Sequence, residues 1–166
     1  MIQKVIKSMI EYFGNDVNQI NHSLKVYGFA STIGSSEIND QHQIDIIEIA
    51  AVLHDIGIPE ARMKYHSSAG KYQELEGPPI ARGILERLNV DSEKIDRICY
   101  LIGNHHSYSE IEGIDFQILV EADFLVNIFE EQMSKTMISS IKQKYFQTQA
   151  GKTILDLIYS DDQMNS

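Results

Sequence analysis

The chain has 166 residues, enough for one domain with its own hydrophobic core. Hydrophobic residues make up 43% of it, which excludes a disordered chain, and three prolines are too few to punctuate many strands. The formal net charge of −10 excludes nonspecific binding to nucleic acid or to an anionic membrane, because both need a positive protein surface. A small phosphorylated substrate is compatible with this charge, since bound metal ions can supply local positive charge.

The first expected helix covers about residues 2–13, where apolar residues recur at helical spacing. Charged residues interrupt this segment, so it lacks the continuous apolar core of a signal peptide. No apolar run in the chain approaches the ~18 residues that a membrane span requires. The single cysteine, Cys99, excludes an internal disulfide and lies among hydrophobic residues, so we expect it in the core. These features predict a cytoplasmic protein.

A second helix is expected to follow, with Asp16 as its N-cap and its end near residue 35. His22 extends an apolar stripe of this helix that includes Val26 and Phe29. Because residues at this spacing share one face of a helix, the His22 imidazole should point towards the interior.

The third expected helix opens at Asp40 and runs to Ile56. It is apolar on almost every side, so it must lie in the middle of the fold, covered by other helices. Its C-terminal end carries the adjacent polar residues His54 and Asp55. Both need partners, because an unpaired carboxylate is costly to bury.

Residues 57–76 are expected to form an irregular loop, since they are rich in Gly, Ser, Tyr and charged residues. Loops of this length tend to be functional, although a plain solvated loop is an equally open alternative. Three residues of this segment could donate hydrogen bonds to a phosphate: Ser67, Ser68 and Lys71. Three others would add positive charge at the same rim: Arg62, Lys64 and His66. Glu60 is a candidate base.

Two further helices are expected before residue 105. Gly77-Pro78-Pro79 should start a fourth helix, because proline is tolerated in a first turn, and Asn89 should end it. Asp91 is a suitable cap for a fifth helix, whose apolar positions lead directly into His105 and His106.

The sixth expected helix, at about 115–131, is strongly hydrophobic and carries Asp123 in its middle. Two amphipathic helices, at about 134–147 and 150–160, complete the domain, and the last six residues should be a solvated tail. No internal repeat, linker or alternating strand pattern is present. The sequence therefore predicts an all-α, single-domain bundle of about seven to eight helices.

Four interior polar residues come from three core helices: His22, His54, Asp55 and Asp123. Two imidazoles and two carboxylates form a nitrogen and oxygen ligand set for a divalent metal ion. Each residue alone has a structural alternative, such as a hydrogen-bonded core histidine or a carboxylate paired with an arginine. A metal ion would also explain how Asp123 stays ionised among hydrophobic neighbours, so the combination favours a metal site.

The order of these residues resembles the signature of the HD-domain superfamily of metal-dependent phosphohydrolases, which is a histidine, an adjacent His-Asp pair and a distant aspartate on a helical bundle. His22 in N-H-S-L-K matches the first position, His54-Asp55 in L-H-D-I-G the pair, and Asp123 in E-A-D-F-L the last. The resemblance covers about residues 16–130. It implies a single HD-like domain over 1–166, with the C-terminal helices of 134–160 added to that core, and these four residues as metal ligands.

Members of the superfamily that resemble two-metal enzymes carry further histidines on the two helices between the pair and the last aspartate. Here His105-His106 fills one of these positions, and Glu76 stands at the other. The resemblance thus implies Glu76 and His105 as ligands of a second ion that Asp55 would bridge. We favour His105 over His106 because it follows Ile98 and Ile102 at helical spacing, with a supporting role beside the ligands as the alternative.

The resemblance implies hydrolysis of a phosphomonoester or phosphodiester bond, with a nucleotide as the small phosphorylated substrate. The cofactor would be Mn²⁺, Fe²⁺, Co²⁺, Ni²⁺ or Mg²⁺, and the ligand set does not choose among them. Such an ion lowers the pKa of a bound water towards ~7. Asp55 would orient or deprotonate that water, while His105 and Lys71 would contact the phosphate.

Two other functions stay open at this point. One is a structural or signalling module that binds metal but catalyses no reaction. The presence of Glu76 in place of a histidine keeps this alternative open. The other is a di-iron oxygenase on the same helical arrangement, against which the missing histidine counts. The sequence sets neither the number of ions nor the oligomeric state.

Overall fold

A computed structural model describes residues 1–159, and all of the regular elements in this range are helical. The α-helices are α1 Ile2–Phe13, α2 Val17–Glu37, α3 Gln41–Leu53, α4 Ile58–Tyr65, α5 Gly70–Arg87, α6 Ser92–Ile102, α7 Ile114–Glu130, α8 Lys135–Tyr145 and α9 Gln149–Tyr159, with a 3₁₀ turn η1 at Tyr108–Glu110. The all-α prediction is confirmed. Within the described range no helix is long and apolar enough to cross a membrane. The expected tail of the last six residues lies outside that range.

Three aspartates fix where the helices of the core begin. Asp16 accepts a hydrogen bond from the backbone N–H of Gln19 at 3.2 Å, and Asp40 accepts one from that of His42 at 3.0 Å. Asp91 does the same for Glu93 at 3.0 Å. Each side chain satisfies an N–H group that the first helical turn leaves without a partner, so the starts predicted for these helices are confirmed.

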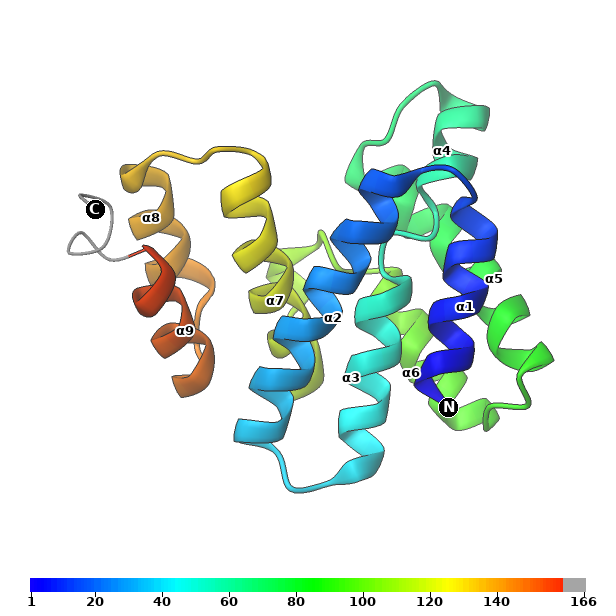
Figure 1. The fold of residues 1–166 in the computed structure, drawn as a ribbon, viewed down its shortest axis with the longest axis horizontal. Helices are drawn as coiled ribbons and strands as arrows, with labels where there is room; N and C mark the ends of the chain where they lie inside the picture. The colour runs from blue at the N-terminus through cyan, green and yellow to red at the C-terminus, as the bar shows by residue number, and fades with distance from the viewer. Residues whose placement is uncertain (160–166) are drawn as a thin grey trace.

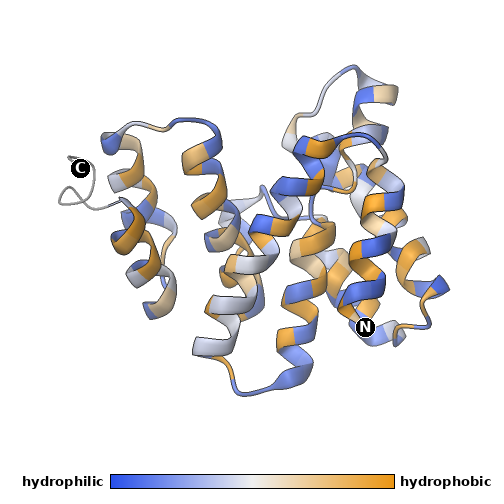
Figure 2. Cartoon of the chain, in the orientation of Figure 1, coloured by the Kyte–Doolittle hydropathy of each residue, from blue (hydrophilic) through white to orange (hydrophobic). Residues whose placement is uncertain are grey.

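Helix α3 lies in the middle of the molecule, as its continuous apolar sequence predicts. It packs against α2, α7, α6 and α1, and its residues from Ile49 to Leu53 are buried. In Figure 1, α2 and α3 run side by side through the centre, while α8 and α9 lie at one end of the molecule. Most other helices carry both hydrophobic and polar residues, as the alternation of orange and blue shows (Figure 2), so they cover the core with one face.

The prediction of an irregular loop over residues 57–76 is wrong. The chain instead forms α4 and the first two turns of α5, and Pro78 and Pro79 lie inside α5 and do not start it. Glu60 in the first turn of α4 and basic residues in its last turn suit the helix dipole, which offsets the polar composition. Helix α5 continues through the prolines because it packs along α6, where the Cys99 thiol donates to the Pro78 carbonyl at 3.4 Å. Cys99 is buried, as predicted.

A close backbone approach at Gly57 joins the end of α3 to α5. A Cβ at Gly57 would lie 2.6 Å from the carbonyl oxygen of Gln73 and 2.7 Å from the backbone nitrogen of Gly77. Backbone atoms in a helix cannot move aside as a flexible side chain can. The absence of a side chain at Gly57 therefore allows α5 to cross directly over the turn that carries His54 and Asp55.

We expect Gly57→Ala to lower the free energy of unfolding by about 2 kcal/mol, because overpacking against rigid backbone strains the core. The measurement is urea denaturation followed by circular dichroism. Gly28→Ala is the matched control, since a Cβ at Gly28 meets no atom within 4 Å. That substitution should stabilise α2 by about 0.5–1 kcal/mol, because alanine favours the helical state more than glycine does. Equal effects of the two substitutions would contradict the close packing at Gly57.

Candidate metal centre

The four residues expected to bind a metal ion converge on one point in the core. Nε2 of His22, on α2, lies 3.1 Å from Nε2 of His54 and 3.2 Å from Oδ1 of Asp123, on α7. Oδ2 of Asp55 lies 3.6 Å from Nε2 of His54, just after α3. All four residues are at most 7% exposed. The structure thus brings together, from three helices, the set that the sequence pattern selects.

A second group of potential ligands lies on the other side of Asp55. Its Oδ1 is 3.4 Å from Nε2 of His105, whereas its Oδ2 is 3.5 Å from Nε2 of His22. Asp55, His105 and His106 each offer a ligand atom, and these atoms lie within 4.8 Å of one another. The two oxygens of one carboxylate therefore face two adjacent groups. His106, which we did not favour from the sequence, joins the second group together with His105.

Hydrogen bonds at the far side of two imidazoles, those of His54 and His105, fix their orientation. Nδ1 of His54 donates to the carbonyl of Ala51 at 2.9 Å, and Nδ1 of His105 donates to the carbonyl of Ile102 at 2.7 Å. A carbonyl can only accept, so both rings carry their proton on Nδ1 and present an unprotonated Nε2 to the cluster when neutral. This is the arrangement that orients histidine ligands of metal ions.

The donor set fits a divalent ion. Nε2 of His105 is buried and has no hydrogen-bond partner among residues 1–159. Such a group is costly to bury unless something outside the chain satisfies it. Nitrogen and carboxylate oxygen atoms at these positions suit a divalent ion, and they do not choose among Mn²⁺, Fe²⁺, Co²⁺, Ni²⁺ and Mg²⁺. The two groups can thus hold metal ions, with His22, His54, Asp55 and Asp123 around one position and Asp55, His105 and His106 around the other.

The buried charges of the cluster balance one another. Burial alone would lower the pKa of His22, but its hydrogen bond to Asp123 and the charges of Asp123 and Asp55 raise it to about 9. Burial opposes ionisation of Asp123, yet the hydrogen bonds from His22 and His54 hold its pKa well below the usual range. Burial and the neighbouring His105 lower the pKa of His106 to about 4, so its imidazole is neutral and can ligate a metal.

Glu130 supports the first group from outside, although no sequence pattern singles it out. Its Oε2 lies 2.8 Å from Nδ1 of His22, and its Oε1 accepts from Lys25 at 2.5 Å. The Glu130 carboxylate therefore orients the ring of His22, as backbone carbonyls orient the rings of His54 and His105. No sequence pattern distinguishes Glu130, because a glutamate in the last turn of a helix is usually an ordinary surface residue.

We expect Glu130→Gln to weaken divalent metal binding roughly 10-fold, because carboxylates that orient a ligating histidine contribute this much to affinity. Titration calorimetry with Mn²⁺ measures the effect. Glu86→Gln removes an exposed glutamate of α5 and is the matched control, expected to leave the affinity unchanged. Equal affinities for Glu130→Gln and wild type would contradict the orienting role.

Two residues selected from the sequence lie elsewhere. Glu76 accepts hydrogen bonds from Nζ of Lys64 at 2.7 Å and from the Tyr65 hydroxyl at 2.8 Å, so it ties α5 to α4 and joins neither group of potential ligands. Lys64 and Tyr65 reach Glu76 because α4 is a helix that packs on α5, whereas the sequence predicts a loop there. Nζ of Lys71 lies over the Tyr72 ring, 4.7 Å from its centroid.

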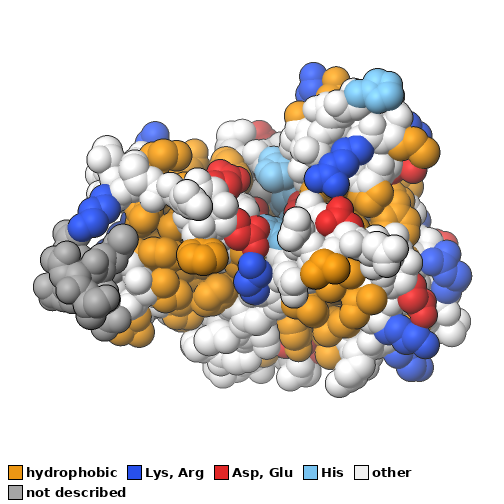
Figure 3. Space-filling model, turned by 45° about the horizontal axis from the view of Figure 1, so that its top comes forward, with side chains coloured by type: hydrophobic (Ala, Val, Ile, Leu, Met, Phe, Trp, Pro, Cys, Tyr) orange, Lys and Arg blue, Asp and Glu red, His pale blue; other side chains and the backbone are white. Residues whose placement is uncertain are grey.

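An open cavity of about 330 Å³ gives access to both groups. His22, Asp55, His106 and Asp123 form its floor, whereas His105 and Lys71 do not line it. Its remaining lining residues are Asn18, Gln19, Ile58, Arg62, Ser68, Gln73, Asn127, Glu130 and Glu131. Of the residues selected from 57–76, Arg62 and Ser68 thus reach the cavity. Figure 3 shows histidine side chains in a hollow of this face with acidic side chains beside them.

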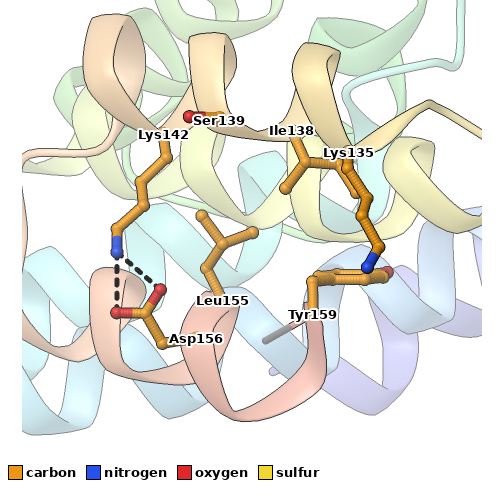
Figure 4. A pocket seen from close by; sticks show the side chains of 7 residues that line it. All are labelled: Lys135, Ile138, Ser139, Lys142, Leu155, Asp156 and Tyr159. Atoms are coloured by element: carbon orange, nitrogen blue, oxygen red, sulfur yellow. Dashed lines mark hydrogen bonds and ion pairs between the residues drawn. The ribbon is translucent and has the colours of Figure 1, made fainter. Parts of the chain in front are cut away.

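A separate cavity of about 190 Å³ lies between α8 and α9. Lys142 reaches across it to Asp156, with Nζ 2.5 and 2.8 Å from the two carboxylate oxygens (Figure 4). Ile138, Leu155 and Tyr159 supply apolar lining. Its described lining residues belong to neither group of potential metal ligands.

Comparison with known proteins agrees with the arrangement of this site. A family model of the HD domain matches residues 20–148. The crystal structure of a predicted HD superfamily hydrolase from an uncultured Thermotogales bacterium superimposes with a TM-score of 0.69 at 23% sequence identity, covering 95% of this chain and 84% of that chain. At this identity the likeness concerns the fold. A search of curated proteins found no match. Because the family match spans most of the chain and includes all four converging residues, the chain belongs to the HD domain family.

Proposed function

We propose that the protein is a metal-dependent hydrolase of phosphoester bonds. The observation that carries the proposal is the position of Asp55, whose two oxygens face two groups of potential metal ligands at the floor of an open cavity. A buried metal site with a purely structural role needs no opening to solvent, so the open cavity favours a catalytic role. The hydrolase name given to the solved structural relative supports the reaction type, and the family resemblance supports a nucleotide as the phosphorylated substrate.

Divalent ions held by the two groups would act as Lewis acids, polarising the phosphoryl oxygens and lowering the pKa of water. The side chains supply position and charge. His54 and His105 are held rigidly by backbone carbonyls. Burial opposes ionisation of Asp55, but the neighbouring imidazoles of His54 and His105 outweigh it and lower the pKa of the Asp55 carboxyl. Asp55 therefore stays ionised and can accept a hydrogen bond from the attacking water.

The reaction is a displacement at phosphorus. The water oxygen forms a bond to phosphorus, the ester P–O bond breaks, and the leaving oxygen takes up a proton, so that the products are an alcohol and a phosphate. The cavity contains four carboxylates and one arginine, Arg62, among its described lining residues. An anionic substrate thus depends on bound ions, together with Arg62, for charge compensation.

A panel of phosphomonoesters and phosphodiesters tests the proposal, with protein purified without chelators and each divalent metal added in turn. The expected result is metal-dependent release of phosphate or alcohol that chelation abolishes. Tight metal binding without hydrolysis of any ester would contradict the proposal and favour a metal-holding module. Iron-dependent uptake of oxygen would instead favour an oxygenase.

A further inference from the structure

The cavity above the metal centre has polar walls, and three of the side chains in them make no hydrogen bond to the described part of the chain. The side-chain amides of Asn18 and Asn127 line it, and neither makes a hydrogen bond within residues 1–159. The Glu131 carboxylate also lines it and makes no hydrogen bond or ion pair within the same range. Amides both donate and accept, and a carboxylate only accepts, so these three groups suit a ligand rich in hydroxyl groups.

Outside the metal-ligand groups, positive charge in the cavity comes from one side chain. Arg62 of α4 is the sole lysine or arginine among its described lining residues, and one of its nitrogens, Nη1, contacts Asp16 at 3.2 Å. The other donors of its guanidinium make no hydrogen bond in the described part of the chain and can bind a phosphate. With Glu130 and Glu131 in the same cavity, a second phosphate group would meet negative charge instead of a partner.

The cavity offers no surface on which a nucleobase could stack. Ile58 is its single hydrophobic lining residue, and the only rings among the described lining residues are the imidazoles of His22 and His106, both in the metal-ligand groups. Its volume of about 330 Å³ is near the lower end of the usual range for small-molecule sites, ~300–1,000 Å³. Base recognition normally uses an aromatic or apolar face, so the walls favour a small polar ligand.

We propose that the substrate is a small hydroxyl-bearing phosphomonoester with a single phosphate, bound by Arg62 at the phosphate and by Asn18, Asn127 and Glu131 at the hydroxyl groups. This inference rests on the proposed function and narrows its substrate class. A free sugar phosphate and the ribose phosphate part of a mononucleotide present the same chemistry. In the second case the base lies outside the cavity and adds little to the affinity.

A comparison of four ligands with metal-loaded protein tests this recognition: a pentose 5-phosphate, a nucleoside 5′-monophosphate, a nucleoside 5′-diphosphate and phenyl phosphate. Affinity is measured as KM where turnover occurs and by titration calorimetry where it does not. The two monophosphates with hydroxyl groups should bind within about threefold of each other, and the other two should bind roughly 10-fold more weakly, the loss expected for one or two hydrogen bonds. Tighter binding of the nucleotide by 10-fold or more would overturn the inference, as would equal binding of phenyl phosphate.

Two variants assign the contacts to residues. Arg62→Gln should weaken all four ligands roughly 10- to 100-fold, the loss expected for a charge-assisted hydrogen bond, with metal content unchanged. Glu131→Gln should strengthen binding of the diphosphate relative to the pentose phosphate. Arg87→Gln, which changes an exposed arginine in the last turn of α5, is the matched control and should alter neither. Wild-type affinities in Arg62→Gln would overturn the inference. Absence of hydrolysis with retained binding would instead overturn the proposed function alone.

Discussion

Asp55→Ala is expected to abolish hydrolysis and to reduce divalent metal binding by at least roughly 100-fold, a loss at the upper end of the effects known for groups around a metal site. The reason is that Asp55 belongs to both ligand groups, so its removal takes one oxygen from each. Asp55→Asn should give a loss of the same kind, because an amide fills the same volume but has one oxygen and no charge. Metal analysis after dialysis measures both variants, and circular dichroism checks that they are folded.

Asp45→Ala is the matched control for this experiment. Asp45 lies in the same helix, α3, pairs with Lys94 at 3.0 Å, and belongs to neither ligand group. The variant should retain wild-type metal content and activity. Folded Asp55→Ala protein with full metal content would contradict the central position of Asp55.

Glu121→Ala should lower the free energy of unfolding by about 3 kcal/mol, because it leaves several buried donors without an acceptor. Glu121 of α7 is fully buried and accepts hydrogen bonds from the backbone N–H groups of Gln147 and Thr148, at 2.6 and 2.9 Å, from the Thr148 hydroxyl, and from Gln117 at 2.7 Å. These bonds hold the turn between α8 and α9 against α7, the helix that carries Asp123. Thermal and urea denaturation measure the loss.

Asp156→Ala provides the comparison for Glu121→Ala. Asp156 also ties α9 to α8, through Lys142, but its side chain is 56% exposed. Exposed ion pairs contribute ~0–1 kcal/mol, so this variant should be close to wild type in stability. A loss as large as that of Glu121→Ala would contradict the assignment of the stabilisation to burial.

Most of the helical architecture follows from local sequence features. Asp16, Asp40 and Asp91 mark helix starts because aspartate accepts hydrogen bonds from free N–H groups of a first turn, whatever packs around the helix. The apolar run before His54 also predicts a central helix from local sequence alone, because a helix that is apolar on almost every side must be covered by other helices. The segment 57–76 misleads because the packing of α5 on α6, and of α4 on α5, stabilises helices there against an unfavourable composition.

The residues of the candidate site also fall into those that local sequence predicts and those that depend on tertiary packing. His22, His54, Asp55 and Asp123 can be selected from sequence because each lies in, or directly after, the apolar face of a helix, where a polar residue needs a partner. Glu130 and His106 depend on how α7 meets α2 and on how α5 crosses the end of α3, which no local pattern encodes. The position of Glu76 beside Lys64 and Tyr65 depends on α4, a helix that the local sequence does not predict.

The number of divalent ions bound per chain tests the central claim most directly. Protein purified without chelators, saturated with Mn²⁺ or Fe²⁺ and freed of excess metal, is analysed by elemental mass spectrometry together with the Asp55→Ala variant. Two adjacent ligand groups that share Asp55 predict two ions in the wild type and a loss of both in the variant. A wild-type protein that binds no divalent ion would contradict the account.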